Sequence, residues 1–147
     1  MAQSARFTLI TAVHLFLVKG DQVLLARRYQ TGYEDGKYSV PAGHVDGNET
    51  ITTALVREAA EEIGIVISPQ NIEFAHVMHR ITDRESVDFF FWCRDWHGEP
   101  KIGEPEKCDE LRWVSLSGLP SNTIPYIKNA LEMALTQTPY SELGWSA

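Results

Sequence analysis

The sequence has 147 residues, which suffices for one domain with a hydrophobic core and is too short for two ordinary domains. Its 13 basic and 20 acidic residues give a net charge of −7, and such a surface repels polyanions, which disfavours binding to nucleic-acid polymers. No apolar run approaches the length of a membrane span, and the N-terminus lacks the layout of a signal peptide. We therefore expect a cytoplasmic protein without a membrane partner.

The first part of the chain predicts a β-hairpin. Residues 7–18 are rich in β-branched and aromatic side chains and indicate a strand. Residues 23–28 indicate a second strand, which returns after a turn at Gly20-Asp21. Residues 29–38 carry two glycines among polar side chains, which is typical of a loop.

A short extended segment, residues 38–45, leads from this loop to a predicted helix. From Thr50 onward, apolar residues recur at the spacing of one helical face. Gly64 followed by the apolar Ile65 is a typical helix C-terminus, so we expect the helix to end there.

The second part of the chain predicts three strands and a second helix. Residues 72–82 and 86–96 indicate two strands around a turn, and the second of these is apolar on both faces, which indicates a sheet covered on both sides. Residues 111–119 indicate a strand that leads into a turn, and residues 124–135 indicate a helix. We expect the aromatic tail, residues 140–147, to pack on the rest of the molecule. Together the elements predict one α/β domain, a mixed sheet with helices on its faces.

The first predicted helix carries three neighbouring carboxylates. Glu58, Glu61 and Glu62 are spaced i, i+3 and i+4, so their side chains emerge on nearly one face of the helix. Clustered carboxylates raise one another's pKa and destabilise a fold unless a cation lies among them. Hard oxygen ligands favour Mg²⁺, which commonly shares its coordination with substrate phosphates. The cluster therefore predicts a metal site that acts on a phosphate compound.

Such a site supports one kind of reaction. A bound metal lowers the pKa of a coordinated water and neutralises charge on the attacked phosphorus. A carboxylate that is not a metal ligand can accept the proton of that water. The expected reaction is hydrolysis of a phosphoanhydride bond.

Residues 43–65 resemble a known sequence pattern. They fit Gly-x5-Glu-x7-Arg-Glu-U-x-Glu-Glu-x-Gly-U, the box of the Nudix family, where U is an apolar residue. The fixed positions are occupied by Gly43, Glu49, Arg57, Glu58, Glu61, Glu62 and Gly64. Ala59 is a small choice at the first apolar position. The segment just before the box departs from the family pattern, since Ala42 replaces a glycine.

The resemblance implies the Nudix fold, an α/β/α sandwich with a mixed central sheet, formed here as a single domain by residues 1–147. It implies cleavage of a nucleoside diphosphate that is linked to another group, with Mg²⁺ as the cofactor and Mn²⁺ as an alternative. It also implies a small-molecule nucleotide as the partner and, as in many members of the family, a homodimer.

The resemblance also assigns expected roles to residues of the box. Glu49 is expected to orient water or to bind metal indirectly, and Arg57 is expected to pair with a box carboxylate and hold it in place. The general base differs among family members, and Glu58 is our first choice. The expected catalytic residues are Glu49, Arg57, Glu58 and Glu61. The expected metal site contains Gly43, Glu58, Glu61 and Glu62.

Further candidates lie outside the helix. In the MutT-like branch of the family, a carboxylate from a later loop commonly joins the metal site, and Glu104 and Glu106 are candidates here, with Glu104 preferred. A solvated acidic loop is the alternative. Substrate contacts are expected from Arg28, from His44 and from Arg80. Plain structural or surface roles for these three residues are the alternatives.

The sequence favours a nucleoside triphosphate as the substrate. The proline of ADP-ribose-cleaving members is missing at residues 79–82, and no tyrosine of the kind found in diadenosine polyphosphate hydrolases occurs between Tyr38 and Tyr126. The expected products are a nucleoside monophosphate and pyrophosphate, and damaged nucleotides are included among the substrates. A hydrolase of nucleotide sugars or dinucleotides is an alternative. A non-catalytic nucleotide sensor is a further alternative, disfavoured because all the glutamates of the box are present.

Overall fold

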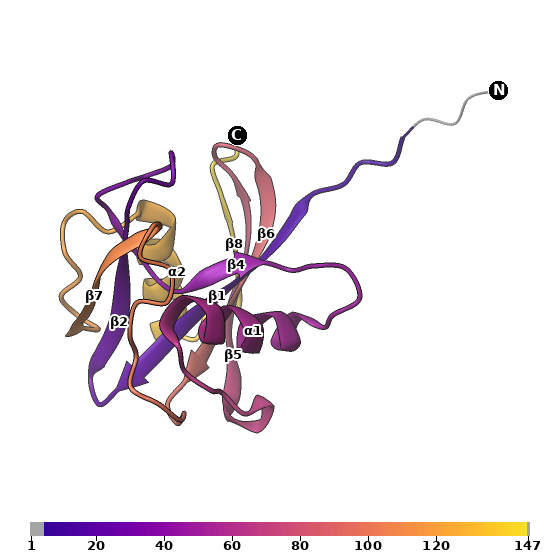
Figure 1. Cartoon of the computed structure of the whole chain (residues 1–147). Helices are drawn as coiled ribbons and strands as arrows, with labels where there is room; N and C mark the ends of the chain where they lie inside the picture. Colours follow the sequence, from indigo (N-terminus) through magenta and orange to yellow (C-terminus); the bar gives the residue numbers. More distant parts are fainter. Residues whose placement is uncertain (1–4, 147) are drawn as a thin grey trace.

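A computed structural model of the chain describes residues 5–146, in which one mixed sheet separates two helices (Figure 1). These helices are α1 (Ile51–Ile63) and α2 (Pro125–Leu135), and a short 3-10 helix, η1 (Pro69–Asn71), precedes β5. The strands are β1 (Ile10–Lys19), β2 (Gln22–Arg28), β3 (Tyr38–Ser39), β4 (Ala42–His44), β5 (Ile72–Ile81), β6 (Glu85–Cys93), β7 (Cys108–Ser115) and β8 (Tyr140–Leu143). Within residues 5–146, no helix is both long enough and apolar enough to cross a membrane.

The long strand β1 organises the sheet. Its first part pairs in parallel with β6 from Ile10 to Leu17, and its last residues pair antiparallel with β2. β4 also pairs antiparallel with β1, while β7 pairs antiparallel with β2. Beyond β6 the sheet continues with the antiparallel β5 and ends with β8, which is parallel to β5. The sheet is therefore mixed, as the sequence predicts.

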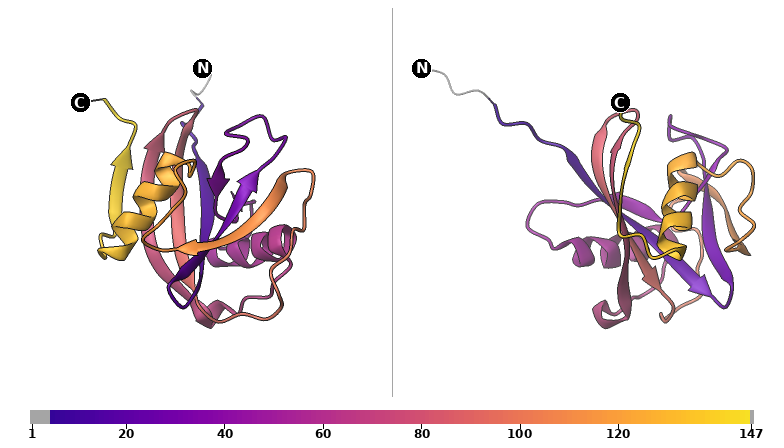
Figure 2. Two further views of the ribbon diagram at one scale, coloured as in Figure 1. Left: turned by 90° about the vertical axis from the view of Figure 1, so that its left-hand side faces the viewer. Right: turned by 180° about the vertical axis from the view of Figure 1, so that it is seen from behind.

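The two helices cover opposite faces of this sheet (Figure 2). Strand β6 shows the alternation most clearly, because Phe90 and Trp92 belong to the core beneath α2, whereas Phe91 and Cys93 belong to the core beneath α1. Burying apolar side chains on both faces is the main source of stability for such a layered fold. The α/β/α sandwich expected from the sequence is confirmed.

The boundaries of several elements differ from the predicted ones. The first strand begins at Ile10 rather than at residue 7, because Ile10 is the first residue with a partner on β6, and the side chain of Phe7 is 69% exposed. The C-terminal tail packs as expected and also forms the unpredicted strand β8. Beyond β8, the Trp145 indole N–H donates to the carbonyl of His79 at 3.1 Å.

A buried ion cluster lies on the α2 side of the sheet. Arg80 of β5 donates from Nε to Asp88 of β6 at 2.9 Å, and the other carboxylate oxygen accepts from His14 Nε2 at 3.0 Å. Asp88 is 0% exposed and Arg80 is 3% exposed, and the guanidinium lies 3.7 Å over the ring of Tyr126. Burial would raise the pKa of Asp88, but the hydrogen bonds from His14 and Arg80 outweigh it and hold that pKa well below its ordinary value.

This cluster makes a testable contribution to stability. A carboxyl whose pKa is depressed by folding stabilises the protein above its unfolded pKa of 3.8, and that stability is lost as the pH falls through the folded pKa. Asp88→Asn leaves Arg80 without its buried counter-charge, so we expect a loss of roughly 3–5 kcal/mol at neutral pH. The difference from the wild type should shrink below about pH 4. Urea unfolding at several pH values measures both effects.

The matched control for this experiment is Asp83→Asn. The Asp83 side chain is 40% exposed and lies 3.7 Å from Arg80, so its removal should change the free energy of unfolding by at most about 0.5 kcal/mol. Equal effects of the two substitutions would show that the buried pair does not carry the stability assigned to it.

Candidate active site

Helix α1 is fixed at both ends and along one face. Its first turn is capped by the Thr50 hydroxyl, which accepts from the Thr53 N–H at 3.1 Å. It ends at Gly64, which has φ 67° and whose N–H donates to Ala60, as the sequence predicts. The buried face, which holds the helix on the sheet, consists of Ala54, Leu55, Ala59 and Ile63. The carboxylates beside this face are therefore held in place by the core.

Two of these carboxylates lie against β4. The backbone N–H of Ala42 donates to the Glu62 carboxylate at 3.0 Å. A side chain at Gly43 would overlap with the carboxylate of Glu58, so this position needs a glycine for the helix to approach so closely. The third box carboxylate, Glu61, is 50% exposed.

Arg57 ties the loop before α1 to the helix. Its guanidinium donates from Nε and Nη2 to the two oxygens of Glu49, at 3.1 and 2.7 Å, and from Nη1 to Glu58 at 2.8 Å. It also donates to the carbonyl of His44 at 3.1 Å. The pKa of Arg57 is raised, chiefly by the bond to Glu49, and the same bond lowers the pKa of Glu49. Arg57 thus fixes the positions of Glu49 and Glu58.

A fourth carboxylate comes from the loop before β7. The N–H of Gly103 donates to the carbonyl of Glu62 at 2.8 Å, and the N–H of Lys101 donates to the carbonyl of Ile63 at 3.0 Å. These bonds anchor the loop on the last turn of α1 and bring Glu104 next to the helix. Glu106, the other candidate in this loop, is exposed and does not line the adjoining cavity.

The cluster carries unfavourable negative charge. Burial raises the pKa of Glu62 to about 8, and the charges of Glu58 and Glu104 add to the increase, although the bond from Ala42 opposes it. The pKa of Glu58 is also raised, first by burial and then by Glu61 and Glu104, against the opposing effect of Arg57. Perturbed carboxyls of this kind gather at functional sites.

A divalent cation fits this donor set. Glu58, Glu62 and Glu104 offer hard oxygen atoms, and a cation would offset the cost of burying their charges. Because Gly43 has no side chain, the Glu58 carboxylate fits beside β4. No group of three His, Cys, Asp or Glu side chains in residues 5–146 is already assembled as a finished metal site. The carboxylates would therefore need to adjust to bind the ion.

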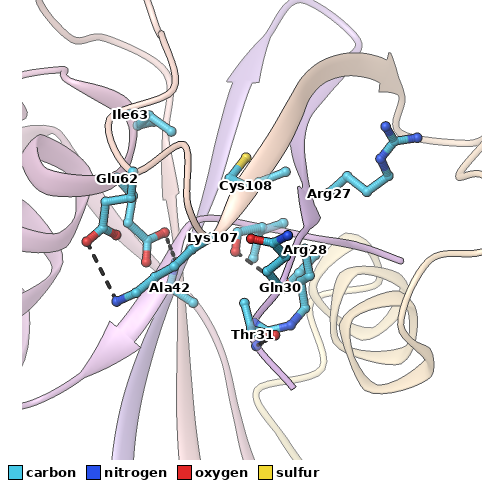
Figure 3. A pocket seen from close by; sticks show the side chains of 13 residues that line it. Arg27, Arg28, Gln30, Thr31, Ala42, Glu62, Ile63, Lys107 and Cys108 are labelled. Carbon is cyan, nitrogen blue, oxygen red and sulfur yellow. Dashed lines mark hydrogen bonds and ion pairs between the residues drawn. The ribbon is translucent and has the colours of Figure 1, made fainter. Parts of the chain in front are cut away.

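A cavity of about 390 Å³ adjoins the cluster (Figure 3). Figure 3 shows Glu62 on one side of it and Arg28, Gln30 and Thr31 on the opposite side. Glu104 also lines the cavity, and it is close enough to Glu62 for its charge to raise the pKa of Glu62. Arg28 is held there by its Nη2, which donates to the Thr31 hydroxyl at 2.9 Å. The cavity therefore has an acidic wall and a wall that contains a cation, an arrangement suited to a phosphate compound bound through a metal.

Most residues of the cavity wall were not identified from the sequence, among them Gln30, Thr31 and Lys107. Gln30 and Thr31 belong to the predicted loop 29–38, where nothing in the sequence singles them out. Lys107 directly follows Glu106, and its N–H donates to the carbonyl of Glu104 at 2.9 Å in a turn. Pro105 was the available signal in the sequence, because proline is favoured at the second position of a turn in which residue i+3 bonds back to residue i.

Two expected substrate contacts lie outside the cavity wall. His44 Nε2 is 2.7 Å from Nη2 of Arg84, and burial, followed by the charge of Arg84, lowers the pKa of His44. The imidazole is therefore the acceptor in this contact. Arg80 belongs to the buried cluster with Asp88, and its Nη1 donates to the Thr82 hydroxyl at 2.7 Å. Of the three residues, the structure brings only Arg28 to the cavity.

The close approach at Gly43 can be tested by substitution. Gly43→Ala should displace the Glu58 carboxylate and weaken Mn²⁺ binding, measured by electron paramagnetic resonance without nucleotide, by about 10- to 100-fold. Gly47→Ala is the matched control, because a side chain there meets open space. Circular dichroism checks that both variants fold, and equal Mn²⁺ affinities of the two variants would contradict the assignment.

Comparison with known proteins gives consistent results. The model of the NUDIX domain matches residues 8–133. The 8-oxo-dGTP diphosphatase of Escherichia coli (strain K12) is 31% identical over 117 residues, which cover 78% of this chain and 85% of that protein. The NAD-capped RNA hydrolase NudC of Stutzerimonas stutzeri (strain A1501) is 26% identical over 113 residues, 73% of this chain, and this match spans only 37% of that longer protein.

A solved structure supports the same relationship. The MutT NUDIX hydrolase from Burkholderia pseudomallei superimposes with a TM-score of 0.79 and 26% identity, over 86% of this chain and 98% of that one. The family match covers most of the chain, and Glu62 of the box lines a cavity. The chain therefore belongs to the Nudix family of hydrolases.

Proposed function

We propose that this Nudix hydrolase is a divalent-metal-dependent pyrophosphohydrolase of nucleoside triphosphates, including damaged ones, with Mg²⁺ as its metal and Mn²⁺ as a substitute. The products would be a nucleoside monophosphate and pyrophosphate. The observation that carries the proposal is the cavity of about 390 Å³, which is lined by the carboxylates of Glu62 and Glu104 and by the guanidinium of Arg28.

The metal would be held by the carboxylates of Glu58, Glu61, Glu62 and Glu104 and by the chain at Gly43. Bound there, it would lower the pKa of water and neutralise charge on the phosphate oxygens. Arg57 would keep Glu49 and Glu58 in position through its hydrogen bonds of 2.7–3.1 Å. Glu58, whose pKa is raised, is the first choice to accept the proton of the attacking water.

The substrate class rests on the relatives and on the charge of the cavity. The Escherichia coli relative is named as a diphosphatase of 8-oxo-dGTP, a nucleoside triphosphate. Arg28 is the proposed contact to its phosphates because it lines the cavity. His44 and Arg80 have no role in this proposal, since they lie outside the cavity and their side chains pair with other residues of the chain. A small nucleotide is the proposed partner. The single domain over residues 1–147, the cytoplasmic location and the homodimer stay predictions.

A second candidate keeps the chemistry and changes the substrate to a dinucleotide or nucleotide sugar. It is favoured by the similarity to NudC, which is named as a hydrolase of NAD-capped RNA. A panel of nucleoside triphosphates, dinucleotides and nucleotide sugars with Mg²⁺ or Mn²⁺ separates the two, with products identified by mass. We expect pyrophosphate release from a triphosphate, and turnover confined to dinucleotides would favour the second candidate.

The role of the carboxylates predicts the effect of two substitutions. Glu58→Gln and Glu61→Gln each remove a charge while keeping the shape of the side chain, and each should lower kcat by roughly 10²- to 10⁴-fold. Glu99→Gln removes a charge from an exposed loop position and should leave kcat unchanged. Steady-state rates of pyrophosphate release measure the effect, and circular dichroism confirms that the variants fold.

Two results would count against the proposed function. Full activity in both the Glu58 and the Glu61 variants would refute the carboxylate chemistry. Tight nucleotide binding by the wild type without any product in Mg²⁺ would instead indicate a non-catalytic sensor.

A further inference from the structure

We propose that Lys107 is a phosphate-binding residue that exchanges partners: its ammonium pairs with Glu104 when the carboxylates hold no metal, and contacts the substrate phosphates once they do. This inference rests on the proposed function and adds a residue that the motif does not contain. It begins from the cations that line the cavity, namely Arg27, Arg28 and Lys107.

Two of these cations already have close hydrogen-bond partners. Arg27 donates through Nε and Nη2 to both carboxylate oxygens of Asp109, at 2.8 and 3.1 Å, and Figure 3 shows its side chain directed away from the acidic wall. Arg28 donates from Nε to the carbonyl of Tyr33 at 2.6 Å and from Nη2 to Thr31 at 2.9 Å. Arg27 is therefore paired with an aspartate, whereas Arg28 keeps its Nη1 for the phosphate contact proposed above.

Lys107 differs from the two arginines. Its Nζ lies 3.8 Å from Oε2 of Glu104, which is an ion pair but too long for a hydrogen bond. Within the part of the chain that the structure describes, the Lys107 ammonium donates no hydrogen bond. The side chain is 62% exposed, and Figure 3 shows it reaching across toward the acidic side of the cavity. Its three donors therefore stay available for a ligand.

The base of the Lys107 side chain is nevertheless well anchored. Its N–H donates to the carbonyl of Glu104, and its carbonyl accepts from the N–H of Tyr29, both at 2.9 Å. The next residue, Cys108, begins β7 and pairs with Arg28 on β2. An anchored backbone with an exposed ammonium that donates no hydrogen bond within residues 5–146 allows the charge to change partner while the loop stays in place.

Charge balance gives the reason for an exchange. One ammonium beside Glu104 partly offsets the negative charge of the carboxylates. A divalent cation bound to the same carboxylate would repel the ammonium, which would then be drawn to the nearest anion. In a chain with a net charge of −7, local cations are needed to attract a polyphosphate, and Lys107 supplies one.

A structural role for the ion pair is the main alternative. An exposed pair of this kind contributes little to stability, so loss of the ammonium should leave the fold intact. The decisive difference lies in ligand binding, because a structural lysine would change neither the affinity for metal nor the affinity for phosphate.

The test compares Lys107→Met, Lys107→Arg and the control Lys128→Met, which removes an exposed charge from α2. We expect Lys107→Met to raise KM and the Kd of pyrophosphate, measured by calorimetry with Mg²⁺, by about 10-fold, with kcat nearly unchanged. Mn²⁺ binding without nucleotide should become tighter in Lys107→Met, because the competing ammonium is gone. Lys107→Arg should restore pyrophosphate binding, and Lys128→Met should match the wild type.

The outcomes separate this inference from the proposed function. Pyrophosphate binding by Lys107→Met as tight as in the wild type, or Mn²⁺ binding that is not tighter, would overturn the partner exchange. Absence of nucleotide turnover in the wild type would refute the proposed function alone, because the pyrophosphate and Mn²⁺ measurements do not depend on turnover. Wild-type protein that binds no pyrophosphate would also overturn the role of Lys107.

Discussion

The site depends on negative charges that the fold forces together. Glu58 and Glu62 are pressed against β4, and Glu104 approaches from a separate loop, so each carboxylate raises the cost of ionising another. Arg57 compensates part of this charge through Glu49 and Glu58. The charge that remains is what makes a divalent cation a favourable partner, and the proposed chemistry follows from that need.

The packing of α1 on the sheet holds these carboxylates together. Apolar contacts on the buried face of α1 fix the helix on the sheet, and the glycine at position 43 lets the helix approach β4. The loop before β7 is tied to the end of α1 by backbone hydrogen bonds from Lys101 and Gly103. The apolar packing of α1 and these backbone hydrogen bonds thus keep mutually repelling carboxylates close together. Such strain is common at catalytic sites.

Patterns of nearby residues in the sequence predicted the course of helix α1 and the two buried faces of β6. The spacing of Glu58, Glu61 and Glu62 fixes their common direction because a helix has a regular period, and Gly64 ends the helix because it adopts a left-handed conformation. The alternation along β6 likewise predicted a sheet buried on both faces, since side chains of a strand alternate between faces.

Features that depend on distant partners were harder to predict. Strand β8 has four residues, and it pairs with β5, which is distant in the sequence. Arg80 was expected to face a substrate, but its partner Asp88 lies across a hairpin, and nothing local indicates this burial. Lys107 reaches the cavity because its loop packs on α1, a contact between residues about forty positions apart in the sequence.

The central claim is that the carboxylates bind a divalent cation, and thermal unfolding with and without Mn²⁺ at pH 6 and pH 8 tests it most directly. With a pKa raised to about 8, Glu62 is mostly protonated at pH 6, so a metal must displace its proton there. The account predicts that Mn²⁺ raises Tm at both pH values and raises it more at pH 8. A Tm that does not change on addition of Mn²⁺, or an increase that is larger at pH 6, would contradict it.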